Sequence, residues 1–477
     1  MRRMSKNIGF LLASQGVAAA AGILVLAISA RYLGPTRFGQ LAVIRAILGV
    51  SMPIIAGGLR ANIIKQISGD PEGAAEYLGS LLTLRWAIAL VTSAIAIVVI
   101  RVLPLSWPLE LAGYAAILWA LSNLWDAICR AIFIAYERSD YNLRLSVAYA
   151  FLVVLLTYLA IRLDLGVAGI LGSQAVAILL VVQVGLFIAY RHFVRPKPRV
   201  DLGRWLYILR RSLPIGVSSM LKQSYDRIDV WLLAALRGST DAGIFNGAYR
   251  VIVQTTPAAI LTANAILPRL SLLAQTARDQ LRTAFERILL ICLIISVPAA
   301  GAVYSLAGPI VTILLGPKFI PSIGALRIVS VMVATSIPDA LLFFCLIALG
   351  KEMTATWCLV ASIAVNATLD LILIPIFGVR GACFGTVGAE WTFFTSALIM
   401  IHRNLQLTSL WQFVGKPLAA GVVMAAVMHS LSPQAPVPGF LAGLLVFLVS
   451  LYLLRALPRG SIRTLRKALV PPAQTLP

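Results

Sequence analysis

Charge is scarce in this 477-residue chain, in which only 12% of the residues are charged and 60% are hydrophobic. Carboxylates are the scarcer sign, with 18 Asp and Glu beside 40 Lys and Arg. A soluble globular domain carries about 25% charged residues. The composition therefore excludes an ordinary water-soluble protein.

Cysteine and histidine are also few, at five and three residues. No CxxC pair occurs and no His stands at ligand spacing, so the sequence lacks the pattern of a metal site or a disulfide framework. The cysteines fall within hydrophobic runs and are expected to be small buried apolar residues: Cys129, Cys292, Cys345, Cys358 and Cys383.

Motifs of catalysis are absent as well. The chain contains no GxxxxGK[ST] phosphate loop, no nucleophile elbow and no HExxH helix. The outer loops are short and carry few carboxylates, so they offer no paired-carboxylate site. We therefore expect no catalytic residues, no metal and no bound cofactor, and the chain is predicted to be a transporter rather than an enzyme.

Long hydrophobic runs are what the chain has in abundance. About 20 apolar residues cross the hydrocarbon core as a helix, and continuous runs favour helices over a β-barrel. The expected fold class is an all-α polytopic membrane protein with about 14 transmembrane helices, whose first span is retained rather than cleaved as a signal peptide. These spans are predicted at 8–30, 40–62, 79–101, 110–136, 142–162, 165–190, 212–236, 242–267, 288–307, 322–349, 353–375, 379–402, 416–433 and 436–457.

The basic residues predict the orientation. An even number of spans places both termini on one side, and most Lys and Arg outside the spans fall on that side. The residues on the opposite side are Arg31, Arg37, Arg101, Arg162, Arg237, Lys318 and Arg380. The positive-inside rule then puts both termini in the cytoplasm. The net charge of +22 is explained by orientation and by contact with anionic lipids, so no nucleic-acid partner is expected.

Two turns repeat along the chain. Gly34, Gly39 and Pro53 recur as Gly238, Gly243 and Pro257 at an offset of 204 residues, and Gly166/Gly169 recur as Gly378/Gly381 at an offset of 212. Paired halves in a transporter usually enclose a substrate path. The alternative is that Gly and Pro simply mark helix ends.

The repeat suggests a division of the chain. Residues 1–190 form an N-terminal lobe of six spans, and 212–402 form a C-terminal lobe of six more. Between them, 191–211 is a basic cytoplasmic linker whose Leu202, Trp205, Leu206 and Leu209 predict an interfacial helix. Residues 403–477 hold two further spans and a basic cytoplasmic tail.

Charges within the spans are the functional candidates, because each costs at least about 2.5–3.5 kcal/mol at the bilayer centre unless it faces water or a partner. Candidates for a cationic substrate cavity are Arg45, Arg85, Arg130, Lys222, Arg227 and Arg250. Candidates for coupling to H⁺ or Na⁺ are Asp126, Asp226, Asp229, Asp339, Asp370 and Glu390. The alternatives are hydrogen bonds between helices and, for Asp126 and Arg130, an ion pair along one helix face.

Arg45 and Arg250 stand out, since each follows its Gly-x₄-Gly turn by six or seven residues. Arginines contributed by both halves would suit a phosphate or pyrophosphate, which Arg holds in a bidentate manner. The alternative is that these side chains extend to the outer membrane interface or pair with a nearby carboxylate. Among the acids, Asp370 follows Asn366 closely, and such oxygen-rich neighbours suit a hard cation.

Several of these motifs carry a family resemblance. The turn 30–39, the Arg227-Ile-Asp229 element, the segment 243–250 and the turn 315–319 resemble the Wzx-type polysaccharide flippases. These belong to the multidrug/oligosaccharidyl-lipid/polysaccharide (MOP) exporter superfamily, together with MurJ and the MATE exporters. The resemblance extends over nearly the whole chain.

The resemblance implies two six-helix lobes in a V around a cavity that opens alternately to either face, with two helices appended. The implied substrate is an undecaprenyl-pyrophosphate-linked oligosaccharide, flipped from the inner to the outer leaflet of the bacterial inner membrane for O-antigen, capsule or exopolysaccharide synthesis. Membrane lipids and a polysaccharide polymerase or glycosyltransferase machinery are the implied partners. Two other transport functions stay open: a lipid II flippase, for which a denser run of arginines is expected, and a MATE-like cation-coupled drug exporter. A non-transport scaffold for a synthase complex is the third alternative.

Overall fold

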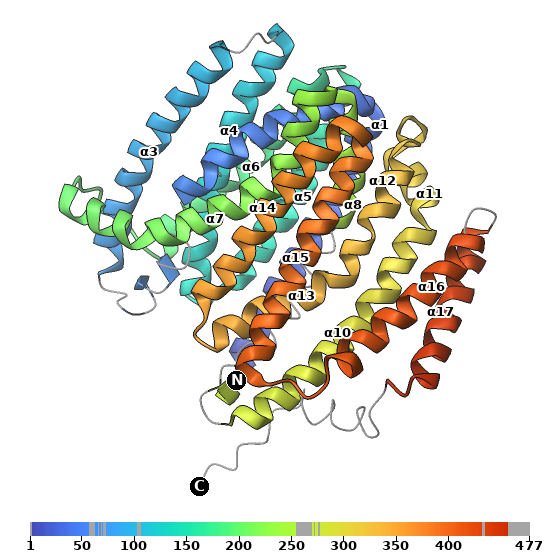
Figure 1. Cartoon of the computed structure of the whole chain (residues 1–477). Helices are drawn as coiled ribbons and strands as arrows, with labels where there is room; N and C mark the ends of the chain where they lie inside the picture. Colours follow the sequence, from blue (N-terminus) through green and yellow to red (C-terminus); the bar gives the residue numbers. More distant parts are fainter. Residues whose placement is uncertain are drawn as a thin grey trace. The chain divides into compact units, whose positions relative to one another are not determined.

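The computed structural model describes residues 2–56, 63–64, 66–67, 69, 73–102, 106–253, 270, 272–274, 277–431 and 435–456. Within these ranges, the side chains of 2–5, 8, 47–56 and 211–226 lie outside the described part. Every element in the described ranges is helical (Figure 1). The expected all-α class is confirmed.

The N-terminal part of the chain is built mainly of long helices (Figure 1). They are α1 (Arg2–Ala56), α3 (Ala74–Val102), α4 (Trp107–Ala135), α5 (Ser139–Arg162), α6 (Gly166–His192), α7 (Leu202–Arg237) and α8 (Ser239–Val253).

The remainder begins with α10 (Arg278–Ser305) and a short broken stretch of α11 (Ala307–Ile310), the π-helical η1 (Val311–Leu315) and the 3₁₀ turn η2 (Pro317–Phe319). The helices that follow are α12 (Ser322–Val329), α13 (Val331–Ala348), α14 (Glu352–Phe377), α15 (Val379–Leu405), the π-helical η3 (Trp411–Gly415), α16 (Lys416–Leu431) and α17 (Pro436–Leu453).

Eleven helices in the described part of the chain are long and apolar enough to cross a membrane. Each of the fourteen predicted spans overlaps a helix, but the first two both overlap α1, and α7 and the 15-residue α8 are not among the eleven. Residues 57–62 and 254–267 of two predicted spans lie outside the described residues. The protein is thus a multi-pass membrane protein, whereas the number fourteen stays a prediction.

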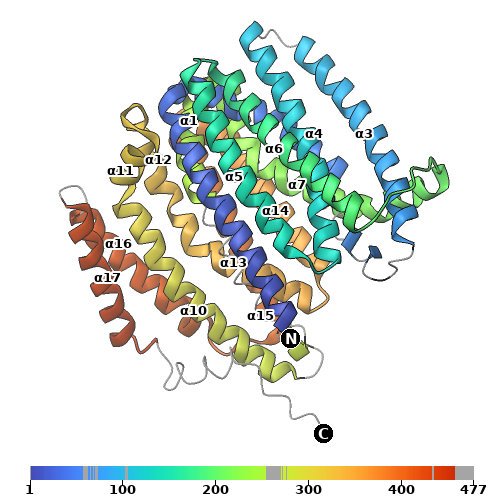
Figure 2. The same ribbon diagram turned by 180° about the vertical axis from the view of Figure 1, so that it is seen from behind.

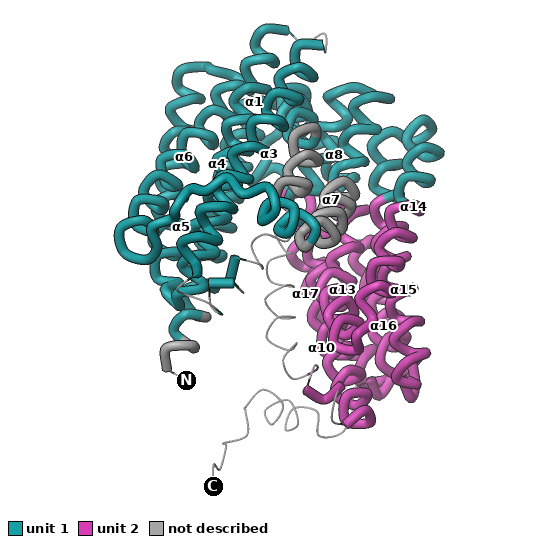
Figure 3. Tube along the Cα trace, turned by 90° about the vertical axis from the view of Figure 1, so that its left-hand side faces the viewer, with its two compact units in different colours: residues 1–254, 311–325, 366–385 teal, residues 255–310, 326–365, 386–477 magenta. Residues whose placement is uncertain are grey.

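The chain forms two compact units (Figure 3). Unit 1 comprises 1–254, 311–325 and 366–385, and unit 2 comprises 255–310, 326–365 and 386–477. Both units therefore draw on distant parts of the sequence. The predicted division into lobes at residues 190 and 402 stays a prediction.

The repeated turns meet inside unit 1. Gly34 breaks α1 with φ 66° and ψ 175°, and Gly238 separates α7 from α8 with φ 92° and ψ 172°. The hydroxyls of Thr36 and Thr240, again 204 residues apart, lie 2.9 Å from each other. Contact between equivalent positions is what a local two-fold axis produces. The sequence repeat thus has a structural counterpart.

The second repeated turn is held in a similar way in each half. The Tyr32 hydroxyl donates to Asp164 Oδ1 (2.5 Å) and accepts from the Gly166 amide (2.9 Å). Arg237 Nε donates to the Ile374 carbonyl at 3.3 Å, just before Gly378. Each half therefore fastens the end of its first long helix to the turn that precedes its last one.

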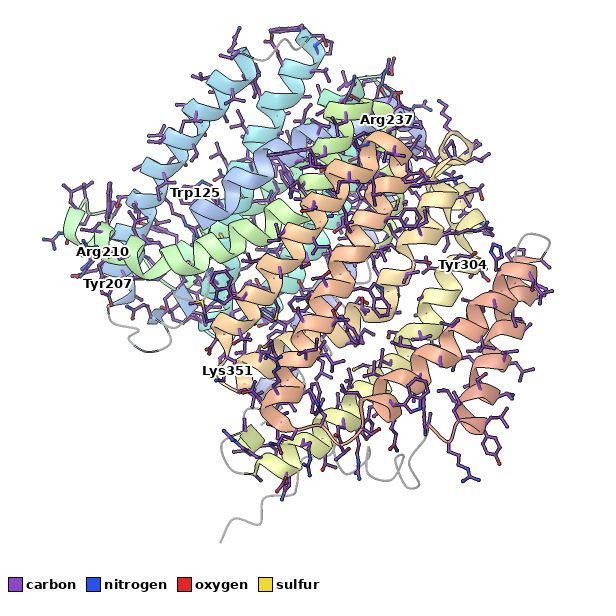
Figure 4. The ribbon with its side chains drawn as sticks, in the orientation of Figure 1. Trp125, Tyr207, Arg210, Arg237, Tyr304 and Lys351 are labelled. Atoms are coloured by element: carbon purple, nitrogen blue, oxygen red, sulfur yellow. The ribbon has the colours of Figure 1, made fainter. Side chains whose placement is uncertain are left out.

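The basic linker packs onto α3. Lys197 N donates to the Ala75 carbonyl at 3.1 Å, and Thr83 Oγ1 donates to the Arg199 carbonyl at 2.9 Å. The predicted interfacial helix is the first part of α7, which begins at Leu202 and runs without a break to Arg237. Figure 4 shows Tyr207 and Arg210 near one end of this helix and Arg237 at the other.

The outward faces of the helices are apolar. Large side chains such as Phe151, Phe187, Leu445 and Tyr452 are more than half exposed, as expected for surfaces in contact with lipid. The five cysteines are free and buried, which confirms their predicted role as small apolar residues.

Candidate functional site

Two cavities lie side by side within unit 1, among α1, α4, α5, α6 and α8. Figure 2 shows α1, α5 and α6 running next to one another, and these helices contact one another. We call the first the arginine cavity. It measures ≈ 250 Å³ and is lined by Ala18, Ala21, Gly22, Val25, Leu26, Ser29, Phe38, Leu41, Arg45, Tyr149, Val153, Gln174 and Arg250.

Arg45 is the best-defined charge of the arginine cavity. Its Nη2 donates to Gln174 Oε1 on α6, and its guanidinium lies over the Trp119 ring at 5.8 Å from the ring centroid. Its Nε is buried and has no hydrogen-bond partner among the described residues. The guanidinium is therefore oriented by one amide and one aromatic ring.

Arg250 lines the same cavity from α8. The two arginines lie near enough to repel each other, and Arg227 adds a third positive charge. Arg227 Nη1 donates to the Arg45 carbonyl at 2.6 Å. No carboxylate belongs to the lining of this cavity. The described lining of the cavity therefore carries positive charge, which favours an anionic ligand.

The second cavity, the ion-pair cavity, measures ≈ 270 Å³. Its charged members are Asp126 and Arg130, whose Oδ2 and Nε are 2.6 Å apart, four residues from each other along α4. The predicted pairing of these two residues along one helix face is therefore present. Ala18 and Tyr149 line both cavities, so the two are adjacent.

A third constellation, the acidic cluster, joins α7 to α14 within unit 1. Asn366 Nδ2 donates to Asp229 Oδ1 at 2.9 Å, and the Asp370 carboxyl lies beside that of Asp229. All three residues are at most 2% exposed. The Asn366 Oδ1 and both oxygens of Asp370 accept no hydrogen bond from the described residues. Two buried carboxylates in contact repel each other unless a proton or a cation lies between them.

The remaining predicted site residues lie elsewhere. Arg85 is 1% exposed and donates from Nη1 to the Leu124 carbonyl at 2.7 Å, in the packing between α3 and α4. Asp339 is buried on α13 and Glu390 is half-buried on α15, both in unit 2. Lys222 and Asp226 belong to α7, but their side chains lie outside the described residues.

The neutral polar residues of the cavities were not among the residues predicted from the sequence. Gln174 orients Arg45, and Asn142, Ser146 and Tyr149 line the ion-pair cavity at i, i+4 and i+7 of α5. Trp119, Asn123, Asp126 and Arg130 form a matching stripe on α4. A search for uncharged polar side chains on one helical face would have found both stripes, because residues at these spacings share a face.

Comparison with known proteins identifies the family of the chain and solved structures that share its fold. The family model described as polysaccharide biosynthesis protein matches residues 4–274. A search of curated protein sequences finds no match. Among solved structures, the lipid II flippase MurJ in an inward closed conformation aligns with a TM-score of 0.76 at 13% identity, covering 94% of this chain and 98% of its own.

Two further structures share the fold. An inward-facing multidrug resistance MATE transporter of the MOP superfamily gives a TM-score of 0.64 at 20% identity, covering 83% of this chain and 96% of its own. A MOP superfamily transporter from Pyrococcus furiosus with a binding pocket of reversed polarity gives 0.55 at 19%, covering 85% and 96%. At these identities the likeness concerns the fold. The match over more than half of the sequence, together with this fold, confirms the resemblance to Wzx-type flippases: the chain belongs to the polysaccharide biosynthesis protein family and has the architecture of the MOP superfamily.

Proposed function

We propose that the protein is a flippase for undecaprenyl-pyrophosphate-linked oligosaccharides. It moves them from the inner to the outer leaflet of the bacterial inner membrane by alternating access, with both termini in the cytoplasm. The flipped glycan supplies O-antigen, capsule or exopolysaccharide synthesis. The observation that carries the proposal is the arginine cavity, which Arg45 and Arg250 from the two repeats line together.

Pyrophosphate is the part of this substrate that the arginine cavity suits. A guanidinium presents a planar set of donors that matches two phosphate oxygens, and Arg45 is already oriented by Gln174. Because binding and release need no covalent step, the proposed transport requires no catalytic residue. The family match and the likeness to a lipid II flippase support a lipid-linked substrate of this class.

The acidic cluster is the proposed site at which an ion gradient is coupled to transport. Asp229, Asn366 and Asp370 offer buried oxygens from two helices, a ligand set that suits Na⁺ or a shared proton. Binding at this cluster would shift the balance between two arrangements of the transporter only if the ion prefers one of them. Asp126 is a weaker candidate for coupling, since Arg130 neutralises it at 2.6 Å.

The test uses cells that lack the protein. Lipid-linked oligosaccharide is expected to accumulate on the inner leaflet, to be cleared by the wild-type chain, and to persist with Arg45→Ala or Arg250→Ala. Arg101→Ala is the matched control, because Arg101 lies over the Tyr114 ring at the end of α3 and outside both cavities. Absence of accumulation would refute the flippase and favour a drug exporter or a scaffold for the polymerase or glycosyltransferase machinery.

A MATE-like exporter makes the opposite prediction. For such a protein the carboxylates dominate transport, and expression confers resistance to cationic drugs. The positive charge of the arginine cavity argues against it, because a cationic drug would be repelled there.

A further inference from the structure

The ion-pair cavity holds more polar groups than its ion pair requires. Its lining comes from α1, α4, α5 and α6. The polar members that matter here are Ser14 of α1, Asp126 and Arg130 of α4, and Asn142 and Ser146 of α5. Arg130 Nη1 donates to Ser146 Oγ at 2.9 Å, and the Ser146 and Ser14 hydroxyls are 2.8 Å apart. These contacts position the polar side chains around the cavity.

Some of these groups have no partner. Asn142 is 2% exposed, yet neither its amide nitrogen nor its amide oxygen forms a hydrogen bond with the described residues. The same holds for Asp126 Oδ1. Buried polar atoms without partners are rare and cost free energy unless water or a ligand satisfies them. The cavity is therefore built for a polar occupant.

The charges of the lining restrict the kind of molecule that the cavity can bind. Asp126 would repel an anion and Arg130 would repel a cation, while each neutralises the other. A neutral molecule that both donates and accepts hydrogen bonds fits best, because Asp only accepts, Arg only donates, and Asn and Ser do both. Trp119 adds an apolar wall. Hydroxyl groups around a compact ring with an apolar face are the chemistry of a sugar.

The volume of the ion-pair cavity and its position next to the arginine cavity also suit a sugar. The cavity, at ≈ 270 Å³, is near the lower end of small-ligand sites, roughly 300–1,000 Å³, so it suits one sugar ring rather than a chain. It shares Ala18 and Tyr149 with the arginine cavity, and the Arg45 guanidinium lies over the Trp119 ring. A sugar attached to a pyrophosphate would thus reach one cavity from the other.

We infer that the ion-pair cavity binds the neutral sugar directly attached to the pyrophosphate of the lipid-linked substrate. This inference rests on the proposed function and deepens it. The arginine cavity recognises the pyrophosphate common to all such lipids, whereas the ion-pair cavity distinguishes a lipid that carries a sugar from one that does not.

Binding to the purified full-length chain in lipid nanodiscs tests the inference. The probes are undecaprenyl pyrophosphate alone and the same lipid carrying glucose, galactose, N-acetylglucosamine or rhamnose, with Kd measured by native mass spectrometry. The wild type is expected to bind at least one sugar-bearing lipid about tenfold more tightly than the bare lipid, as one or two buried hydrogen bonds would provide.

Two variants remove the preference without touching the arginines. Asn142→Leu deletes an amide that makes no hydrogen bond within the described protein, so it should fold, and Ser146→Ala deletes one hydroxyl. Both should bring the Kd ratio to within about twofold of one while the Kd of the bare lipid stays unchanged. The matched control is Ser173→Ala, which removes the Thr157–Ser173 hydroxyl contact of 3.0 Å between α5 and α6, outside both cavities.

The outcomes separate the inference from the proposed function. If the wild type binds bare and sugar-bearing lipids equally, or if Asn142→Leu keeps the preference, the cavity holds only water and the inference is overturned, while the flippase stands. If the wild type binds none of these lipids, the proposed function fails and the inference with it. Loss of both lipids to the same extent in Asn142→Leu would also overturn a role specific to the sugar.

Discussion

The arginine cavity and the acidic cluster lie in the same compact unit, and each gathers like charges beside a neutral amide, but the charges are of opposite sign. In the first, Arg45 and Arg250 lie together with a neutral amide and no carboxylate in the lining. In the second, Asp229 and Asp370 lie together with a neutral amide, Asn366. Like charges gathered in this way are unfavourable by themselves. Each group is therefore suited to a ligand of the opposite sign.

The ion-pair cavity shows the contrasting solution. There Asp126 and Arg130 neutralise each other at 2.6 Å, so no charged ligand is needed. Three sites in unit 1 with net positive, net negative and zero charge provide a way to recognise an anion, a cation and a neutral group separately. If the three sites act independently, a substitution at one of them leaves ligand binding at the other two unchanged.

The largest effect is expected from emptying the arginine cavity. Arg45→Ala combined with Arg250→Ala should weaken undecaprenyl pyrophosphate binding about 10²- to 10⁴-fold, because each hydrogen bond to a charged group contributes about 1.5–3 kcal/mol. Native mass spectrometry of the variant in nanodiscs measures this Kd. A change below about threefold would show that the phosphate binds elsewhere. Arg101→Ala should leave the Kd unchanged.

Neutralising the acidic cluster should come next. Asp229→Asn with Asp370→Asn is expected to remove the dependence of flipping on a Na⁺ or H⁺ gradient and to slow flipping about 5- to 150-fold, the usual range of coupling between two sites. Translocation into proteoliposomes with imposed gradients measures both. The pyrophosphate Kd should stay the same, and Glu390→Gln in unit 2 serves as the control. Retained ion dependence in the double variant would exclude the cluster as the coupling site.

A smaller effect is expected from adding a carboxylate to the arginine cavity. Gln174→Glu places an acid beside Arg45 and so imitates the Asp126–Arg130 pair. It should weaken pyrophosphate binding about tenfold through repulsion of the phosphate. Gln174→Leu removes the same amide without adding charge and should have a lesser effect. Equal losses in the two variants would mean that the amide, and not the charge, matters.

The smallest effect concerns the amide of the acidic cluster. Asn366→Leu removes the 2.9 Å bond from Asn366 Nδ2 to Asp229 Oδ1 and should raise the ion concentration for half-maximal flipping about two- to tenfold, as one hydrogen bond would. An ion titration of flipping in proteoliposomes measures it. Matching ion dependence in wild type and variant would assign Asn366 to packing alone.

Much of the fold was predictable because its determinants are local. The hydrophobic runs indicated each helical span, since backbone groups in lipid must bond within their own segment. The pairing of Asp126 with Arg130 was equally local, because residues four apart share a helix face. The repeat of Gly34 and Gly238 also pointed to two related turns, and the structure brings Thr36 and Thr240 of those turns into contact.

The site was only partly predictable. Arg45, Arg250, Asp229 and Asp370 were candidates because of their charge, but so were Arg85, Asp339 and Glu390, which the structure places outside the two cavities and the acidic cluster. Hydropathy identifies an ionisable residue within a span without saying which helix it will face. The cavity-lining residues Gln174 and Asn142 escaped notice because they carry no charge.

By itself, the sequence determined a helical multi-pass membrane protein with a repeated turn, because span length, helical periodicity and turn residues act over short stretches of chain. Only the tertiary structure decided which buried charges share a site. Arg45 meets Arg250, and Asp229 meets Asp370, across more than a hundred residues. These contacts depend on how the faces of distant helices pack. That packing is determined by shape complementarity between whole helices, which no local sequence pattern encodes.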